Sequence, residues 1–201
     1  MDTVNKTKQH FNETASDYNN SDDGKFVKPM YKELQKEIEK IGRGKLLDVG
    51  CGNGNLFTFL SEEYYQMFGI DFSDNMISEA KKNCGDKASF CVADAEKLPF
   101  DEDTFDIITC NASFHHYIHP NAVLSEMNRV LKAGGVLIIG DPYLPAAARP
   151  LMNVFTKFSN EGDYHFYGLN EMKKLFLKNG FSPIAFKRTG KHTALHIAEK
   201  L

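Results

Sequence analysis

The stretch that decides the fold of this chain is Leu46-Leu-Asp-Val-Gly50-Cys-Gly52-Asn-Gly54-Asn-Leu56. Its first four residues are mostly apolar, as expected of a short strand buried on both faces. Three glycines at alternate positions then interrupt the strand, and apolar residues follow at helical spacing from Leu56 onward. Glycine tolerates positive φ and lets a ligand approach the backbone closely. The order of strand, glycine turn and helix predicts the first βα unit of a doubly wound sheet, in which ligands bind at the carboxyl ends of the strands.

Aspartates stand at or near the ends of three predicted strands. Asp48 precedes the first glycine inside an apolar strand end, where a carboxylate is costly without a partner. Asp71 ends the apolar run 67–71 and lies 19 residues after Gly52, where nucleotide-binding βαβ units hold ribose hydroxyls. Asp94 ends a third run of this kind. A single strand-end aspartate could be a helix cap, but three at one sheet edge predict a polar, partly cationic ligand.

The glycine spacing separates two classes of cofactor. The dinucleotide fingerprint is G-x-G-x-x-G, whereas this loop reads G-x-G-x-G with an aspartate in front. Asp48-Val-Gly50-Cys-Gly52-Asn-Gly54 resembles the first motif of class I S-adenosylmethionine (SAM)-dependent methyltransferases. Arg129-Val-Leu-Lys-Ala-Gly-Gly-Val-Leu-Ile-Ile139 resembles a late signature of their "type 11" group, with Ala133 in place of the usual proline. The resemblance extends from about Phe11 to the end of the sequence. Within this group, the chain is similar to the small-molecule methyltransferases of quinone biosynthesis.

The resemblance implies a complete architecture. We expect an α/β, Rossmann-like doubly wound sheet of seven strands with helices on both faces and the last strand antiparallel, in a single domain spanning 1–201. Residues 1–24 are either a frayed terminus or an N-terminal cap over the cofactor, and 144–167 are expected to form a substrate lid. Asn170 is predicted to cap a late helix, and a hairpin around Gly190 is predicted to close the sheet.

Composition limits the partners. The chain has 201 residues, is 42% hydrophobic and carries a net charge of -3, which argues against nucleic acid as a substrate. It has no apolar run long enough for a membrane span and no signal peptide at its N-terminus, so we expect a cytoplasmic protein. The four cysteines show no C-x-x-C pair and are expected to be buried thiols. The oligomeric state is not readable from the sequence.

The same resemblance implies the cofactor site. SAM is the expected cofactor and S-adenosylhomocysteine (SAH) its product. Asp94 would meet the adenine amino group, and Met76 either packs on the adenine or belongs to the core. The predicted cofactor-binding residues are Tyr18, Asp48, Gly50, Cys51, Gly52, Gly54, Asp71, Phe72, Met76, Ala93, Asp94, Ala95, Asn111, Ala112 and His115.

A histidine-rich stretch follows the fourth predicted strand: Ser113-Phe-His115-His116-Tyr117-Ile-His119-Pro120. Three histidines in five residues suggest a metal, but no carboxylate or cysteine cluster in the sequence completes a ligand set, so no metal is predicted. In the family, a similar pair lines the cofactor and substrate pocket. His115, His116 or Tyr117 could act as a general base if the methyl acceptor carries a proton, and the sequence does not choose among them.

The function predicted is therefore transfer of a methyl group from SAM to an O, N or C nucleophile of a small molecule by in-line displacement. The alternatives are an NAD-dependent oxidoreductase, which lacks its third glycine here, and a non-catalytic SAM-binding protein. A nucleic-acid methyltransferase acting on base amines would carry Asn/Asp-Pro-Pro-Tyr/Phe after the fourth strand, where this chain has Asn111-Ala-Ser-Phe114.

Overall fold

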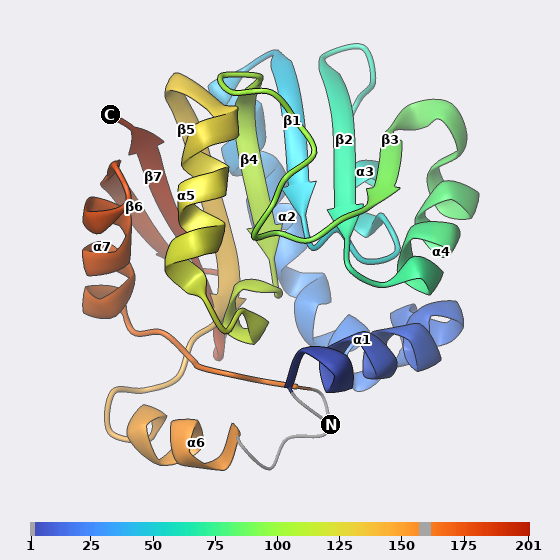
Figure 1. Cartoon of the computed structure of the whole chain (residues 1–201). Coiled ribbons are helices and arrows are strands. Elements are labelled where there is room, and N and C mark those ends of the chain that lie inside the picture. The colour runs from blue at the N-terminus through green and yellow to red at the C-terminus, as the bar shows by residue number, and fades with distance from the viewer. Residues whose placement is uncertain (1–2, 157–161) are drawn as a thin grey trace.

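The computed structural model describes residues 3–156 and 162–201. They contain a seven-stranded sheet in the order β3-β2-β1-β4-β5-β7-β6 (Figure 1). Only β7 runs antiparallel to its neighbours, β5 and β6, so the predicted topology is confirmed. The strands are β1 (Gly44–Val49), β2 (Tyr65–Asp71), β3 (Ser89–Val92), β4 (Phe105–Asn111), β5 (Leu131–Pro142), β6 (Phe181–Arg188) and β7 (Thr193–Lys200).

Helices cover both faces of this sheet and also the edge where the parallel strands end (Figure 1). Three short 3-10 helices, η1 (Ala15–Asn20), η2 (Gly85–Lys87) and η3 (Phe114–His116), complete the described elements. The α-helices are α1 (Thr3–Thr14), α2 (Asp22–Ile41), α3 (Asn55–Thr58), α4 (Asp74–Cys84), α5 (Pro120–Val130), α6 (Arg149–Phe155) and α7 (Leu169–Lys178).

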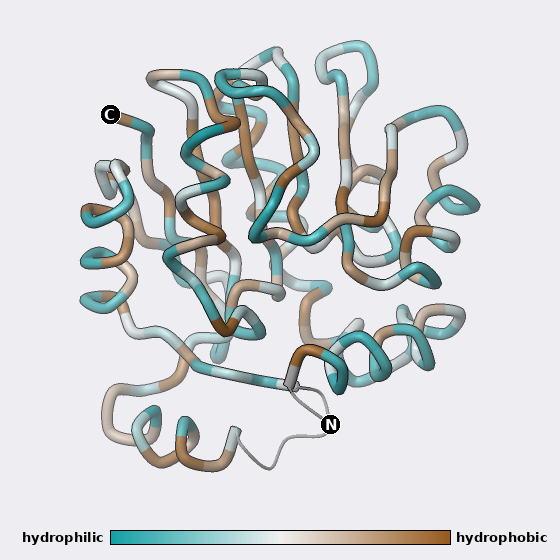
Figure 2. Tube along the Cα trace, in the orientation of Figure 1, coloured by the Kyte–Doolittle hydropathy of each residue, from teal (hydrophilic) through white to brown (hydrophobic). Residues whose placement is uncertain are grey.

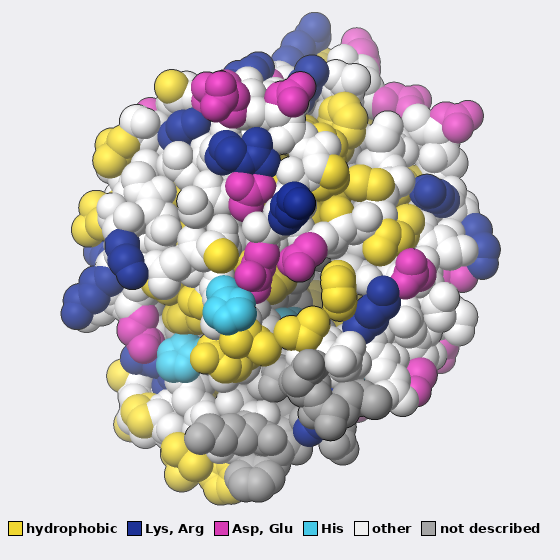
Figure 3. Space-filling view, in the orientation of Figure 1, with side chains coloured by type: hydrophobic (Ala, Val, Ile, Leu, Met, Phe, Trp, Pro, Cys, Tyr) yellow, Lys and Arg dark blue, Asp and Glu magenta, His cyan; other side chains and the backbone are white. Residues whose placement is uncertain are grey.

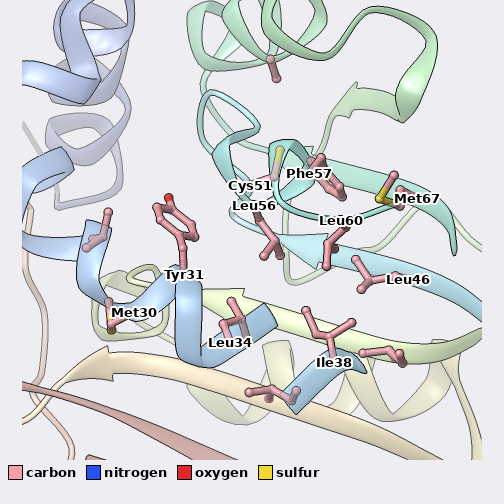
Figure 4. Close-up of a cluster of buried hydrophobic side chains, with 14 of the residues drawn as sticks. Met30, Tyr31, Leu34, Ile38, Leu46, Cys51, Leu56, Phe57, Leu60 and Met67 are labelled. Carbon is pink, nitrogen blue, oxygen red and sulfur yellow. The ribbon is translucent and has the colours of Figure 1, made fainter. Parts of the chain in front are cut away.

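Alternation along the strands divides the core into two layers. Leu46 and Ile107 pack with buried side chains of α2, α3 and α4, and Figure 4 shows Leu34 and Ile38 of α2 in this layer. The next residue along β1, Leu47, packs with α5 and α7 on the opposite face. Successive strand residues point to opposite faces, so a strand that is apolar at consecutive positions needs helices on both sides. The central strands are accordingly hydrophobic along their length (Figure 2).

Side chains cap the N-termini of α4 and α7 in different ways. Ser73 caps α4, because its Oγ accepts the backbone N–H of Met76 at 3.1 Å. The prediction for Asn170 was wrong, since it lies exposed within the first turn of α7 and the N-cap is Gly168. Glu171 explains the difference: its carboxylate accepts the Gly168 N–H at 2.8 Å and complements the positive end of the helix.

The amino-terminal segment is ordered and helical rather than frayed. Figure 1 shows α1 beneath the carboxyl ends of the central strands, and η1 leads from it into α2. Tyr18 of η1 is buried, at 9% exposure. The described part of this segment therefore lies at the carboxyl edge of the sheet, and its role as a cap over the cofactor stays a prediction.

The expected burial of the four cysteines needs adjustment. Cys51 and Cys110 are buried free thiols as predicted, but Cys84 and Cys91 are only half-buried. They lie at the end of α4 and on the edge strand β3, where the core is thinner. No helix in the described part of the chain is long and apolar enough to cross a membrane.

Candidate active site in two adjoining cavities

The first cavity opens where the strand order reverses, between β1 and β4, which is where doubly wound sheets bind ligands. Its empty volume is about 1110 Å³ with the open mouth included. None of its described lining residues is lysine or arginine, so a phosphate would find no cationic side chain there. Most of the predicted cofactor residues line it: Tyr18, Asp48, Gly50, Cys51, Asp71, Phe72, Ala93, Asp94, Ala95, Asn111 and Ala112.

The wall of this cavity requires a glycine at position 50. Gly50 has a φ of +74°, and a Cβ there would lie 2.1 Å from Ser113 Oγ. Gly52 also has positive φ, yet nothing lies within 4 Å of its Cβ position. Gly54 is the left-handed N-cap of α3. Gly52 and Gly54 do not line the cavity but shape the turn that brings Gly50 and Cys51 to its wall.

Asp71 is fixed at the rim by the backbone around it. Its Oδ2 accepts the N–H of Gly52 at 2.9 Å and its Oδ1 accepts the N–H of Ser73 at 2.8 Å. Burial raises the pKa of this carboxyl, and the backbone donors oppose that shift. Each carboxylate oxygen has a second lone pair, so Asp71 can still accept hydrogen bonds from two hydroxyls of a ligand.

Asp48 forms the floor of the cavity. It is 2% exposed, and Thr109 donates a hydrogen bond to its Oδ1 at 2.7 Å. Burial raises its pKa to about 7, with repulsion from Asp71 adding to the shift and the Thr109 hydrogen bond opposing it. A cationic ligand would favour the ionised form. The floor is therefore suited to an ammonium or sulfonium group.

Asn111, at the end of β4, has its polar atoms unpaired. The side chain is buried, and neither Oδ1 nor Nδ2 has a hydrogen-bond partner among the described residues. Buried amides are rarely left in this state, and Asn111 lines the cavity, so a ligand can supply the partners. Two carboxylates, an unpaired amide and close backbone fit SAM, which carries an ammonium, a sulfonium, hydroxyls and a carboxylate.

Besides Gly52 and Gly54, two further predicted cofactor residues do not line the first cavity. Met76 is 1% exposed within the core of α4 and does not line the first cavity, so the structure favours its core role. His115 lines the second cavity instead of the first.

The second cavity adjoins the first and has an empty volume of about 1170 Å³ with its mouth included. The two share the wall residues Phe11, Tyr18, Ala112 and His116. The second is lined mainly by apolar side chains from α1, α2, the end of β5 and the segment after residue 162. In Figure 3, hydrophobic, acidic and histidine side chains gather around a hollow near the middle of the visible face.

Two aspartates distant in sequence meet the histidines of η3 in this cavity. His115 Nδ1 lies 2.8 Å from Asp141 Oδ1, and His115 Nε2 lies 3.5 Å from Asp163 Oδ1. Burial alone would lower the pKa of His115, but the two carboxylates raise it to about 10. The pKa of His116 falls to about 3 through burial and repulsion from His115. Tyr117 shares a 2.8 Å hydrogen bond with Ser113, and burial raises the pKa of its hydroxyl, so it stays protonated and is not available as a general base.

Sequence reasoning missed both aspartates. Asp141 ends an apolar strand, as Asp48, Asp71 and Asp94 do, and could have been grouped with them. Asp163 carries no local signal. No carboxylate lies near the histidines in the sequence, but the fold brings Asp163 within 3.8 Å of His116 Nδ1.

The segment that follows residue 162 covers the histidines. The backbone N–H groups of Tyr164 and His165 both donate to the carbonyl of His115, at 2.9 and 3.0 Å. Phe11 of α1 meets the His116 ring edge-on with 5.4 Å between centroids. Tyr167, expected in the lid, is instead a buried core residue packed on Phe114. Phe158, expected there too, lies outside the described residues.

Comparisons with known proteins agree with this geometry. Residues 47–139 match the family model described as methyltransferase domain. Demethylmenaquinone methyltransferase of Staphylococcus saprophyticus is 28% identical over 199 residues, covering 86% of this chain and 85% of the relative. A SAM-dependent methyltransferase from Methanosarcina mazei superimposes with a TM-score of 0.66 at 23% identity, covering 79% of this chain and 93% of that one. The [4+2]-cyclase SpnF also superimposes, with a TM-score of 0.70 at 17% identity and coverage of 84% and 80%.

The cyclase shows that this fold alone does not specify methyl transfer. The chain has the fold of class I SAM-dependent methyltransferases, and residues 47–139 match the methyltransferase-domain model. The residues that line the first cavity fit SAM as the cofactor. The predicted enzyme class is confirmed, and the NAD-dependent oxidoreductase and the non-catalytic binder are set aside.

Proposed function

We propose that the enzyme methylates an O, N or C nucleophile of a small molecule held in the second cavity, using SAM held in the first. The observation that carries this proposal is the shared wall, since Phe11, Tyr18, Ala112 and His116 line both cavities. Methyl transfer requires donor and acceptor to meet in line, and two adjoining cavities with a common wall allow that. SAM supplies an electrophilic methyl group on a sulfonium.

The residues of the first cavity would bind and orient the cofactor. Asp71 would accept ribose hydroxyls, and Asp94 would accept the adenine amino group. Asp48 and Asn111 would contact the charged end of the cofactor. Alignment of two reactants contributes up to about 7–11 kcal/mol to such a reaction, so rigid placement by these residues is their main contribution.

The acceptor proposed is a small, largely apolar molecule. Phe26, Val27, Leu144, Met152 and Phe166 line the second cavity, and a net charge of -3 disfavours nucleic acid. The Staphylococcus relatives act, by their names, on demethylmenaquinone, so a hydroquinone ring is the first acceptor to try. His116 lines this cavity and is neutral because its pKa is lowered to about 3, so it is the proposed proton acceptor if the nucleophile carries a proton.

We also propose that the whole chain forms one domain in which 1–24 and 144–167 cover the two cavities. The described parts of these segments contact each other, since Thr7 Oγ1 donates to the Gly162 carbonyl at 3.3 Å. A covered site excludes water from the reacting groups. Closure and opening of such a cover would gate binding and release.

The test is a screen of small metabolites, including a short-chain demethylmenaquinol, incubated with enzyme and SAM. Mass spectrometry would follow the methylated product together with SAH, and Asp71→Ala would serve as the matched low-affinity control. Equal molar formation of SAH and a methylated acceptor is the expected result. Conversion of a substrate without SAH formation would contradict the proposal and indicate a reaction like that of the cyclase.

A further inference from the structure

The wall of the second cavity brings together three side chains with metal-ligating atoms: His115, His116 and Asp163. One atom from each lies within 4.8 Å of the others. Asp163 Oδ1 is 3.5 Å from His115 Nε2 and 3.8 Å from His116 Nδ1. The side chains are only 8%, 8% and 16% exposed in the order His115, His116, Asp163. We infer that His115 Nε2, His116 Nδ1 and Asp163 Oδ1 bind a divalent first-row transition metal ion such as Zn²⁺.

The spacing of the three atoms suits one ion. Zinc lies about 2.0–2.1 Å from nitrogen and 2.0–2.2 Å from oxygen ligands, so two tetrahedral ligand atoms are about 3.3 Å apart. The observed separations from Asp163 Oδ1, 3.5 and 3.8 Å, are close to that value, and all three atoms lie within 4.8 Å of one another. Rotation of the two histidine side chains toward Asp163 would bring the set to the tetrahedral spacing.

The hydrogen bonds around the histidines leave the ligating nitrogens available. Asp141 Oδ1 accepts from His115 Nδ1 at 2.8 Å, which directs Nε2 toward Asp163. This carboxylate–histidine arrangement is the one that orients metal ligands in proteins. His116 Nδ1 is buried and has no hydrogen-bond partner among the described residues. A buried imidazole nitrogen without a partner requires an explanation, and a bound cation provides one.

The ligand set and its surroundings select the kind of ion. Two imidazoles and one carboxylate suit zinc, iron, cobalt or nickel, whereas Mg²⁺ and Ca²⁺ prefer oxygen ligands. Asp22 and Asp23 also line this cavity, and none of its described lining residues is lysine or arginine. The local charge therefore favours a cation.

Three protein ligands leave a coordination position open toward the cavity. A role for the ion in methyl transfer rests on the proposed function, whereas ion binding does not. An acceptor hydroxyl bound at the open position would have a lowered pKa and would lose its proton to water. The oxygen lone pair would then form the new bond to the methyl carbon as the sulfur leaves with its electron pair.

The test uses untagged full-length protein stripped with a chelator and titrated with Co²⁺, whose visible absorption reports its coordination, and with Zn²⁺ by calorimetry. We expect one ion per chain. Asp141→Asn should lower the affinity about 10–100-fold, and His116→Ala and Asp163→Asn should lower it further. His119→Gln is the matched control, since His119 is exposed and pairs with Glu96 outside the second cavity.

SAH binding to the same samples shows whether each variant is folded. If the stripped protein binds SAH but no ion, or if His116→Ala and Asp163→Asn bind Co²⁺ as the His119→Gln variant does, the metal site is refuted. His115 would then be an imidazolium held between two aspartates. The proposed methyl transfer would survive that result, because it is tested by SAH formation and not by ion binding.

Discussion

The two cavities of this enzyme share a wall but are built in different ways. The first is made mainly by the carboxyl ends of β1 to β4 and the loops that follow them, so its residues sit at fixed places in consecutive βα units. The second is made by α1, α2, the end of β5 and a segment after residue 162, which are far apart in the chain. Under the proposed function, the cofactor is therefore bound by the regular part of the fold and the acceptor by its irregular part.

The sharpest test of the first cavity is Gly50→Ala. A Cβ would lie 2.1 Å from Ser113 Oγ, and displacing Ser113 would break its hydrogen bond to Tyr117. Relief of this clash must move the loop that forms the cavity wall. We expect calorimetry to show a loss of SAH affinity of about 100-fold, the size of effect that a misplacement of about 1 Å can have. Gly52→Ala is the control, since it has positive φ but open space. If the two variants bind SAH equally, the close approach of Gly50 to Ser113 is not needed for cofactor binding.

Asp71→Ala should produce the next largest effect. The carboxylate is placed for two ribose hydroxyls, and each charge-assisted hydrogen bond is worth about 1.5–3 kcal/mol before water compensates. We expect SAM affinity to fall about 10–100-fold while thermal unfolding shows a folded protein. Asp86→Ala, at an exposed position beyond α4, should bind normally. An unchanged dissociation constant for folded Asp71→Ala would refute the assignment.

Asp48 offers a test based on pH. Its pKa is raised from 3.8 to about 7 in the folded protein, so the native state binds more protons than the unfolded state between these values. The free energy of unfolding should therefore fall with rising pH over this window, by roughly 1.4 kcal/mol per pH unit from this group. Asp48→Asn removes the titration.

The measurement is urea unfolding at pH 5 and pH 7 without ligand. We expect the wild type to lose roughly 2 kcal/mol more than Asp48→Asn over this range. Parallel changes in the two proteins would mean that Asp48 stays ionised in the empty cavity.

The difference between the two cavities also determines which parts of the site could be predicted from the sequence. Strand ends and glycine loops are local patterns, so the doubly wound sheet and the places of Asp48 and Asp71 at its carboxyl edge could be predicted. The partners of His115 were not predictable, because Asp163 reaches it only after the chain has passed β5 and α6. The prediction for Asn170 was wrong because the side chain of Glu171 accepts the backbone N–H of Gly168, which is the N-cap of the helix.

The last and smallest effect concerns the cover that joins the two cavities. Asn12 Oδ1 accepts from Ser73 Oγ at 2.6 Å, and the Asn75 amide donates to the Asn12 carbonyl at 2.9 Å. Asn19 Oδ1 accepts from the amides of Asn53 and Asn55 at 3.0 and 2.6 Å. These bonds tie α1 and η1 to the rim of the first cavity. A ligand that orders the rim should therefore also order the cap, and through Thr7 the segment after residue 162.

Hydrogen exchange with and without SAH tests this coupling. Protection should rise severalfold in residues 3–20 and 162–166 as well as in the loop 50–54, whereas α5, which lines neither cavity, should not change. Phe11→Ala removes the ring that packs on His116 between the two cavities. It should weaken the response in 162–166 while leaving that of the loop 50–54 intact. If SAH slows exchange only in the glycine loop, the cap and the lid do not respond to the cofactor. Their aromatic side chains are then fixed packing, and the acceptor enters a cavity that is already closed on one side.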